Sequence, residues 1–253
     1  KMRTQQYGYH YQYTRNMLFV SQPEAPYLET ALLSNVAATD WSWSALFGDY
    51  DQDGKQDLFI SNGIPKRPNN LDFIRYISNE EIHNKLNNSR LVDQKALELM
   101  PSGKVSNYFF KGESALQFND VSKDWGAGLP SISGAIAVGD LDNDGDLDIT
   151  YDTGVDFIGK AYHFNTDGLG TFSPPEYIES PIGTGSFLNY AVDIDGDGDM
   201  DLTSGNFDND TDITYLYWYE NLTILGNHDF KSLGIKIYPN PVNELLVIES
   251  PIP

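Results

Sequence analysis

An aspartate-rich segment of nine residues occurs three times in the chain, and it constrains the fold more than any other feature. The copies begin at Asp49, Asp140 and Asp193, and each has Asp at positions 1, 3, 5 and 9 and Gly at position 6. Calcium is a hard cation that takes about 6–8 oxygen ligands. Alternate carboxylates can converge on one ion if the chain curls, and Gly at position 6 permits the sharp turn. The pattern therefore predicts three calcium-binding loops.

The candidate ligands are the aspartates of each loop, together with the backbone carbonyl of position 7. We expect about three Ca²⁺ ions, one per loop. The candidate residues are Asp49, Asp51, Asp53, Lys55 and Asp57 in loop 1, Asp140, Asp142, Asp144, Asp146 and Asp148 in loop 2, and Asp193, Asp195, Asp197, Asp199 and Asp201 in loop 3.

The obvious alternative is an EF-hand, in which helices flank the calcium loop on both sides. An EF-hand needs a bidentate Glu at position 12, but the chain has Ile60, Tyr151 and Ser204 there. Short apolar runs flank the first two loops instead, and such runs are typical of buried strands. The repeat is therefore predicted to be strand, calcium loop, strand.

The spacing of the loops indicates the architecture. Asp140 and Asp193 are separated by about one four-stranded propeller blade of ~40–50 residues. Asp49 and Asp140 lie much further apart, and residues from about 65 to 104 carry a helical pattern. We expect an all-β fold, a β-propeller of possibly incomplete blades, with a helical insertion over about 65–104. The alternating run Tyr215–Tyr219 is expected to pack between neighbouring sheets.

The composition limits the classes of partner that the chain can bind. The chain has 37 acidic and 16 basic residues, for a net charge of −21. Such a surface repels nucleic acid and anionic membranes, so we expect no nucleic-acid partner. No apolar run approaches the ~20 residues needed to span a bilayer, which argues against membrane insertion. The absence of cysteine excludes disulfides and zinc–thiolate sites.

The loops resemble the FG-GAP or VCBS repeat of integrin-type propellers and bacterial surface proteins. The run Thr39–Phe47 leading into loop 1, with Asp72-Phe73 and Asp124-Trp125-Gly126, resembles exported VCBS proteins of Bacteroidota related to the ASPIC/UnbV group. This resemblance covers roughly residues 1–155. It implies the same calcium ligands, a location outside the cell or on the outer-membrane surface, and no general catalytic residues.

The tail carries a second resemblance. Ile235–Val242, with its Pro-Asn-Pro turn, and the following Leu245–Ile248 resemble the opening of a type IX secretion C-terminal sorting domain. An ordinary strand–turn–strand is the alternative. We therefore expect a propeller over 1–231 and the start of a sorting domain over 232–253. Both termini are expected to lie within a longer polypeptide.

Three functions are compatible with this sequence. The preferred hypothesis is a secreted or cell-surface, non-catalytic calcium-binding module that binds a glycan or a protein partner. The second is a polysaccharide-active enzyme, which a deep pocket with unassigned carboxylates or a His–Tyr pair would favour. The third is a structural surface or filament component that associates with other chains at blade edges. The four histidines are far apart in the sequence and show no metal-ligand spacing.

Overall fold

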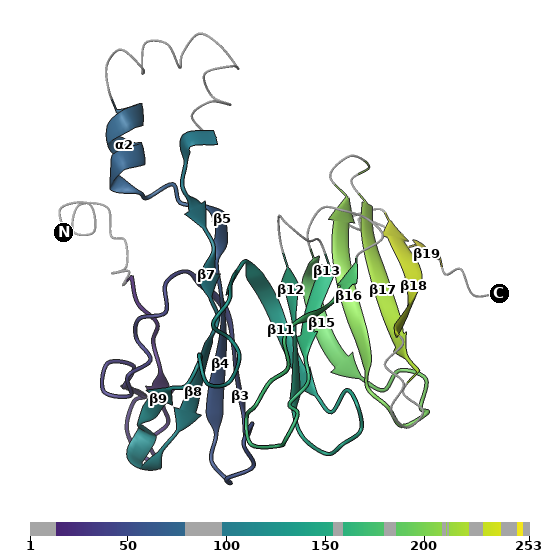
Figure 1. The fold of residues 1–253 in the computed structure, drawn as a ribbon, viewed down its shortest axis with the longest axis horizontal. Helices are drawn as coiled ribbons and strands as arrows, with labels where there is room; N and C mark the ends of the chain where they lie inside the picture. Colours follow the sequence, from purple (N-terminus) through teal and green to yellow (C-terminus); the bar gives the residue numbers. More distant parts are fainter. Residues whose placement is uncertain are drawn as a thin grey trace.

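The computed structural model describes residues 14–78, 98–153, 159–179, 186–208, 211, 213–222, 230–238 and 247–249. Most of the described elements are β-strands, and they form antiparallel sheets (Figure 1). The expected all-β class is confirmed.

Three antiparallel sheets follow one another along the chain, and in each the strands lie in sequence order. The first sheet consists of β3 (Ser42–Gly48), β4 (Asp57–Asn62), β8 (Tyr108–Gly112) and β9 (Phe118–Asp120). The second consists of β11 (Ser133–Gly139), β12 (Asp148–Thr153), β13 (Gly159–His163) and β14 (Glu176–Glu179). The third consists of β15 (Ser186–Val192), β16 (Asp201–Asp208), β17 (Ile213–Asn221), β18 (Phe230–Tyr238) and β19 (Val247–Glu249).

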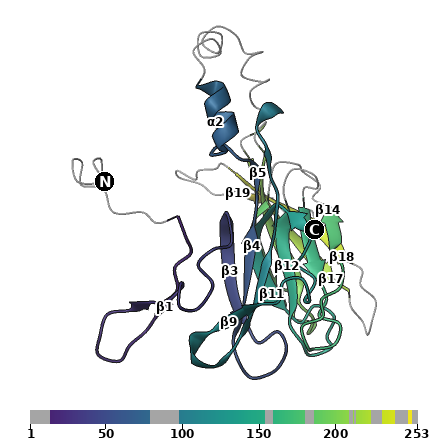
Figure 2. The same cartoon turned by 60° about the vertical axis from the view of Figure 1, so that its left-hand side comes forward.

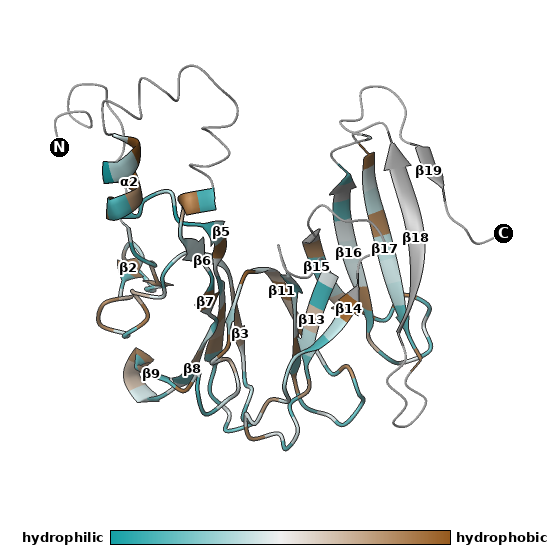
Figure 3. Cartoon of the chain, turned by 45° about the horizontal axis from the view of Figure 1, so that its top comes forward, coloured by the Kyte–Doolittle hydropathy of each residue, from teal (hydrophilic) through white to brown (hydrophobic). Residues whose placement is uncertain are grey.

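The three sheets stand side by side, with their first strands as the main contacts between them. Strand β11 lies against β3 on one side and against β15 on the other. Figure 1 shows the sheets as successive layers across the molecule. The loops that join the strands are largely hydrophilic (Figure 3).

Aromatic and aliphatic side chains fill the spaces between the sheets. Phe59 and Phe109 of the first sheet pack with Ile149 and Tyr151 of the second. The second and third sheets are joined by a cluster that contains Leu141, Tyr162, Phe164, Leu202, Tyr215, Tyr217 and Tyr219. The expected packing of the run Tyr215–Tyr219 between sheets is therefore confirmed for its three tyrosines.

The N-terminal segment covers the other face of the first sheet. Its short strands β1 (Phe19–Val20) and β2 (Leu28–Glu29) pair with each other and stand apart from the main sheets (Figure 2). Ala31, Val36 and Ala37 then pack against Leu58, Ile60 and Phe110. A bidentate ion pair from Arg15 to Glu29, with N–O distances of 3.0 and 2.6 Å, holds this segment together.

A helix lies where the sequence predicts an insertion. Helix α2 (Leu71–Ile77) begins after Asn70, whose side chain accepts hydrogen bonds from the backbone of Asp72 and Phe73. Strands β5 (Ile64–Lys66) and β6 (Ser102–Gly103) pair with each other, so the segment leaves and rejoins the fold at one place. Residues 79–97 of the predicted insertion lie outside the described residues.

Smaller elements lie outside the three main sheets. Strand β7 (Val105–Ser106) pairs with β10 (Pro130–Ser131), and the short 3₁₀ turn η1 (Ser114–Leu116) joins β8 to β9.

Residues 235–238 of the tail lie in β18 and residues 247–248 in β19, and these two outer strands of the third sheet pair antiparallel. Residues 245 and 246 lie outside the described residues. The position expected as a domain boundary, 231/232, falls inside β18. The Pro-Asn-Pro turn lies outside the described residues. Among the described residues, the helices are too short and too polar to cross a bilayer.

Candidate metal centre

Each Asp-rich loop connects the first and second strands of a sheet. Loop 1 joins β3 to β4, loop 2 joins β11 to β12, and loop 3 joins β15 to β16. The predicted strand–loop–strand unit is confirmed for all three copies. Position 12, where an EF-hand would carry its Glu, lies inside a strand each time. The three loops lie at the same end of the sheets (Figure 1).

The same hydrogen bond curls all three loops. The carboxylate at position 1 accepts the backbone N–H of the Gly at position 6, at 2.9 Å in loop 1, 3.0 Å in loop 2 and 3.2 Å in loop 3. These glycines, Gly54, Gly145 and Gly198, all have positive φ. An L side chain rarely adopts that conformation, which explains the Gly in the repeat.

The curl brings carboxylates together in each loop. Three carboxylate oxygens lie within 4.8 Å of one another in every copy. The groups are Asp49, Asp51 and Asp53 in loop 1, Asp140, Asp142 and Asp148 in loop 2, and Asp193, Asp195 and Asp197 in loop 3. Asp57, Asp144 and Asp201 are candidate ligands that lie outside these groups. The backbone carbonyls expected as ligands at position 7 belong to Lys55, Asp146 and Asp199. The side chain at this position is therefore a lysine in loop 1 and an aspartate in loops 2 and 3.

The aspartate at position 9 has a structural role in every copy. Its Oδ2 accepts the backbone N–H of position 2, at 3.0 Å for Asp57, 2.7 Å for Asp148 and 3.0 Å for Asp201. Its Oδ1 accepts a backbone N–H at or just after the end of the third strand. All three side chains are fully buried. Each oxygen retains a second lone pair, so this anchoring is compatible with metal ligation.

Several buried carboxylate oxygens in the loops have no hydrogen-bond partner among the described residues. They are Asp49 Oδ1, Asp142 Oδ1, Asp146 Oδ1 and Asp199 Oδ1. A buried polar atom without a partner is costly, and a buried charge more so. A hard cation would satisfy these oxygens, so the donor set fits calcium.

The electrostatics of the loops also favour a bound positive charge. Burial raises the pKa of Asp148 to about 8 and that of Asp57 to about 6, against an ordinary value of 3.8. Burial and then the neighbouring carboxylate at position 5 raise the pKa of both Asp146 and Asp199. A bound divalent cation would reverse these shifts, because it favours the ionised form.

Loop 1 contains a contact that sequence reasoning missed. The ammonium of Lys55 lies 3.0 Å from Asp53 Oδ2, and that of Lys111, on β8, contacts Asp51 and lies 3.4 Å from Asp53. Lys111 is far from the loop in the sequence, and no local pattern points to it. Only the pairing of β4 with β8 brings it to the loop.

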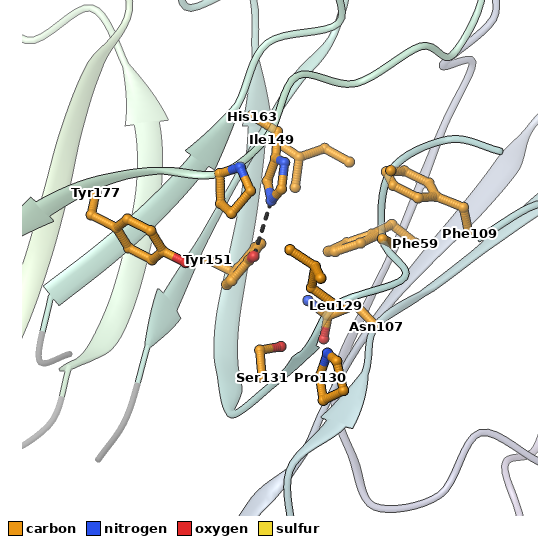
Figure 4. Close-up of a pocket in the computed structure, with 13 residues that line it drawn as sticks. Phe59, Asn107, Phe109, Leu129, Pro130, Ser131, Ile149, Tyr151, His163 and Tyr177 are labelled. Atoms are coloured by element: carbon orange, nitrogen blue, oxygen red, sulfur yellow. Dashed lines mark hydrogen bonds between the residues drawn. The ribbon is translucent and has the colours of Figure 1, made fainter. Parts of the chain in front are cut away.

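A His–Tyr pair, the feature that would favour an enzyme, lies between the first and second sheets (Figure 4). His163 Nδ1 lies 2.7 Å from the Ser173 carbonyl, so this nitrogen carries the proton. Nε2 then accepts a hydrogen bond from Tyr151 Oη at 3.0 Å. The adjoining cavity holds about 50 Å³, and the described residues that line it include no carboxylate. Ligand pockets are typically ~300–1,000 Å³, so this pair is part of the core. The other three histidines lie outside the described residues.

Comparison with known proteins finds no family model that matches the chain. Curated proteins likewise provide no match.

Proposed function

We propose that the chain is a calcium-binding β-propeller module of the FG-GAP/VCBS type, in which the three sheets are consecutive blades. The observation that carries this proposal is the threefold recurrence of one carboxylate cradle with buried, unpartnered oxygens. Calcium would bind the loops and hold each first strand to its second. Export by type IX secretion and a cell-surface location belong to the same proposal, through the resemblance of the sequence.

The packing of equivalent positions supports a series of blades. Position 2 of the loop is Tyr50 in loop 1 and Leu141 in loop 2, with exposed fractions of 0% and 1%. In both cases the following sheet covers the side chain. The equivalent Ile194 of loop 3 is 43% exposed. A repeated interface of this kind is expected when blades stack around an axis.

A calcium titration tests the metal claim. We expect the melting temperature to be higher in calcium than in chelator and to rise with calcium concentration, because an ion that binds only the folded state stabilises that state. Asp140→Asn combined with Asp193→Asn should remove most of this rise. Asp72→Asn, on the exposed surface of α2, is the matched control and should leave it unchanged. An identical melting temperature in chelator and in millimolar calcium would refute the proposal.

A polar groove supports binding rather than catalysis. A depression of about 700 Å³ is lined by Arg15, Asp40, Trp41, Arg67 and other polar residues. Trp41 is 43% exposed, and such a ring can stack on a sugar. Asp40, the one carboxylate that the described residues contribute to this lining, is paired with Arg67 at 2.8 Å, which lowers its pKa. Glycoside hydrolysis typically uses a pair of carboxyl groups, one of them ionised, and among the described residues this lining holds a single one, so we propose a non-catalytic glycan site here.

Binding to a glycan array before and after Trp41→Ala tests this part of the proposal. We expect binding that the substitution weakens by roughly tenfold or more, since stacking on an aromatic ring contributes about 1–3 kcal/mol. Tyr27→Ala, another exposed aromatic residue outside the groove, is the control. Hydrolysis of a polysaccharide by the purified chain would instead favour the enzyme.

A further inference from the structure

The three loops are not equivalent in charge, and the difference predicts which of them need a metal. We propose that the ammonium groups of Lys111 and Lys55 neutralise loop 1 in place of a cation, so that the chain binds two calcium ions, in loops 2 and 3. This inference rests on the proposed function, because it concerns which loops take calcium.

The first argument is the position of Lys111. Its ammonium contacts Asp51, whose side chain is 5% exposed, and reaches Asp53 at 3.4 Å. Asp51 and Asp53 are two of the three carboxylates that converge in loop 1. Lys55 adds a second ammonium on Asp53, at 3.0 Å. A calcium ion could bind here only after displacing positive charge from the carboxylates that it needs as ligands.

The second argument is that the other two blades have no lysine at either position. The backbone N–H groups of Gly112, Asn165 and Asn221 donate to the position-9 aspartate of their own blades, which establishes the register. The residues immediately before them are therefore equivalent, and they are Lys111, Phe164 and Glu220. At position 7 of the loop, Lys55 is likewise replaced by Asp146 and Asp199.

The third argument is the balance of charge. Loops 2 and 3 each contain five aspartates, and among the described residues no lysine or arginine forms an ion pair with them. Asp146 and Asp199 are each 6% exposed, and each has a buried Oδ1 that no described residue hydrogen-bonds. Loops 1 and 3 each have one such oxygen and loop 2 has two, so charge is what distinguishes loop 1: its two ammonium groups neutralise half of its four carboxylates.

The experiment counts calcium ions bound per chain by equilibrium dialysis, with isothermal titration at the same protein concentration. We expect two ions for the unmodified chain. Asp142→Asn, at position 3 of loop 2, should reduce the count to one. Asp51→Asn, the equivalent change in loop 1, should leave it at two. This matched pair depends on no lysine variant and keeps the inference falsifiable even if such a variant misfolds.

A lysine variant tests the cause. Lys111→Gln combined with Lys55→Gln should raise the count from two to three, whereas Lys123→Gln, an exposed lysine away from the loops, should not change it. Three ions in the unmodified chain, or a lower count after Asp51→Asn, would overturn the inference and leave the proposed function intact. No bound calcium at all would refute the proposed function, and the inference with it.

Discussion

Asn165, just after the third strand of the second sheet, donates from its side-chain Nδ2 to the backbone carbonyl of Tyr50 in loop 1, at 2.8 Å. Its own backbone N–H donates to Asp148 of loop 2, also at 2.8 Å. One residue therefore links two successive loops. Asn221 repeats the arrangement, with Nδ2 donating to the Leu141 carbonyl at 2.8 Å and the backbone N–H to Asp201. The loops are thus connected by hydrogen bonds that require no metal.

Replacing Asn165 with Ala should destabilise the chain by about 1–3 kcal/mol, because it leaves the buried Tyr50 carbonyl without this donor. Denaturant unfolding monitored by tryptophan fluorescence measures the loss. Asn119→Ala is the matched control, since this exposed side chain hydrogen-bonds Glu113 at the surface, and it should cost less than about 0.5 kcal/mol. Equal effects of the two substitutions would contradict the role assigned to Asn165.

The position-9 and position-5 aspartates of loop 2 should behave differently toward calcium. Asp148→Asn places an amide group against two backbone donors and should destabilise the protein by about 1–3 kcal/mol even in chelator. Asp144→Asn, on the exposed side of the loop, should cost little in chelator and should reduce only the stabilisation by calcium. Denaturant unfolding of both variants with and without calcium separates the two roles. A calcium-dependent loss alone for Asp148→Asn would argue against anchoring.

Lys160 forms the most deeply buried ion pair among the described residues. Its ammonium lies 2.7 Å from Asp152 Oδ1, and the two side chains are 0% and 2% exposed. It also bonds the Leu188 carbonyl and Asn189 Oδ1, and so joins the second sheet to the third. Lys160→Met should therefore lower the free energy of unfolding by about 3–5 kcal/mol, because it removes the ion-pair partner of a buried carboxylate.

Adding Asp152→Asn to Lys160→Met should recover part of that loss, since the double variant contains no unpaired buried charge. The comparison is made by denaturant unfolding at one calcium concentration. Lys66→Met, at an exposed position of β5, is the control for the loss of a lysine. A double variant less stable than Lys160→Met alone would contradict the assignment of an ion pair.

His163 should make stability depend on pH. Burial holds the pKa of this imidazole below its ordinary value of 6.5. As the pH falls through 6.5, the unfolded chain binds a proton that the folded chain does not, so its contribution to stability is present above pH 6.5 and lost below it. His163→Gln should flatten this part of the stability profile. Urea unfolding in excess calcium gives the difference in the free energy of unfolding between pH 7.5 and pH 5.5. The same difference in the unmodified chain and in the variant would argue against a buried neutral His163.

The sequence alone predicted the local units of this fold. Strands on both sides of each loop follow from short apolar runs, and the turn follows from an aspartate and a glycine five residues apart. The packing of Tyr215, Tyr217 and Tyr219 follows from their alternation. The calcium ions, the propeller and the sorting domain stay predictions.

The links between these units were decided by the tertiary structure. The sequence could not reveal that Lys111 reaches loop 1, that Asn165 bonds Tyr50, or that β18 extends the third sheet. The physical reason is the separation in the sequence between the residues that interact. Backbone conformation and amphipathic period depend on residues a few positions apart, so a sequence displays them directly. A hydrogen bond or ion pair between distant segments depends on strand register and sheet packing, and these exist only once the chain is folded.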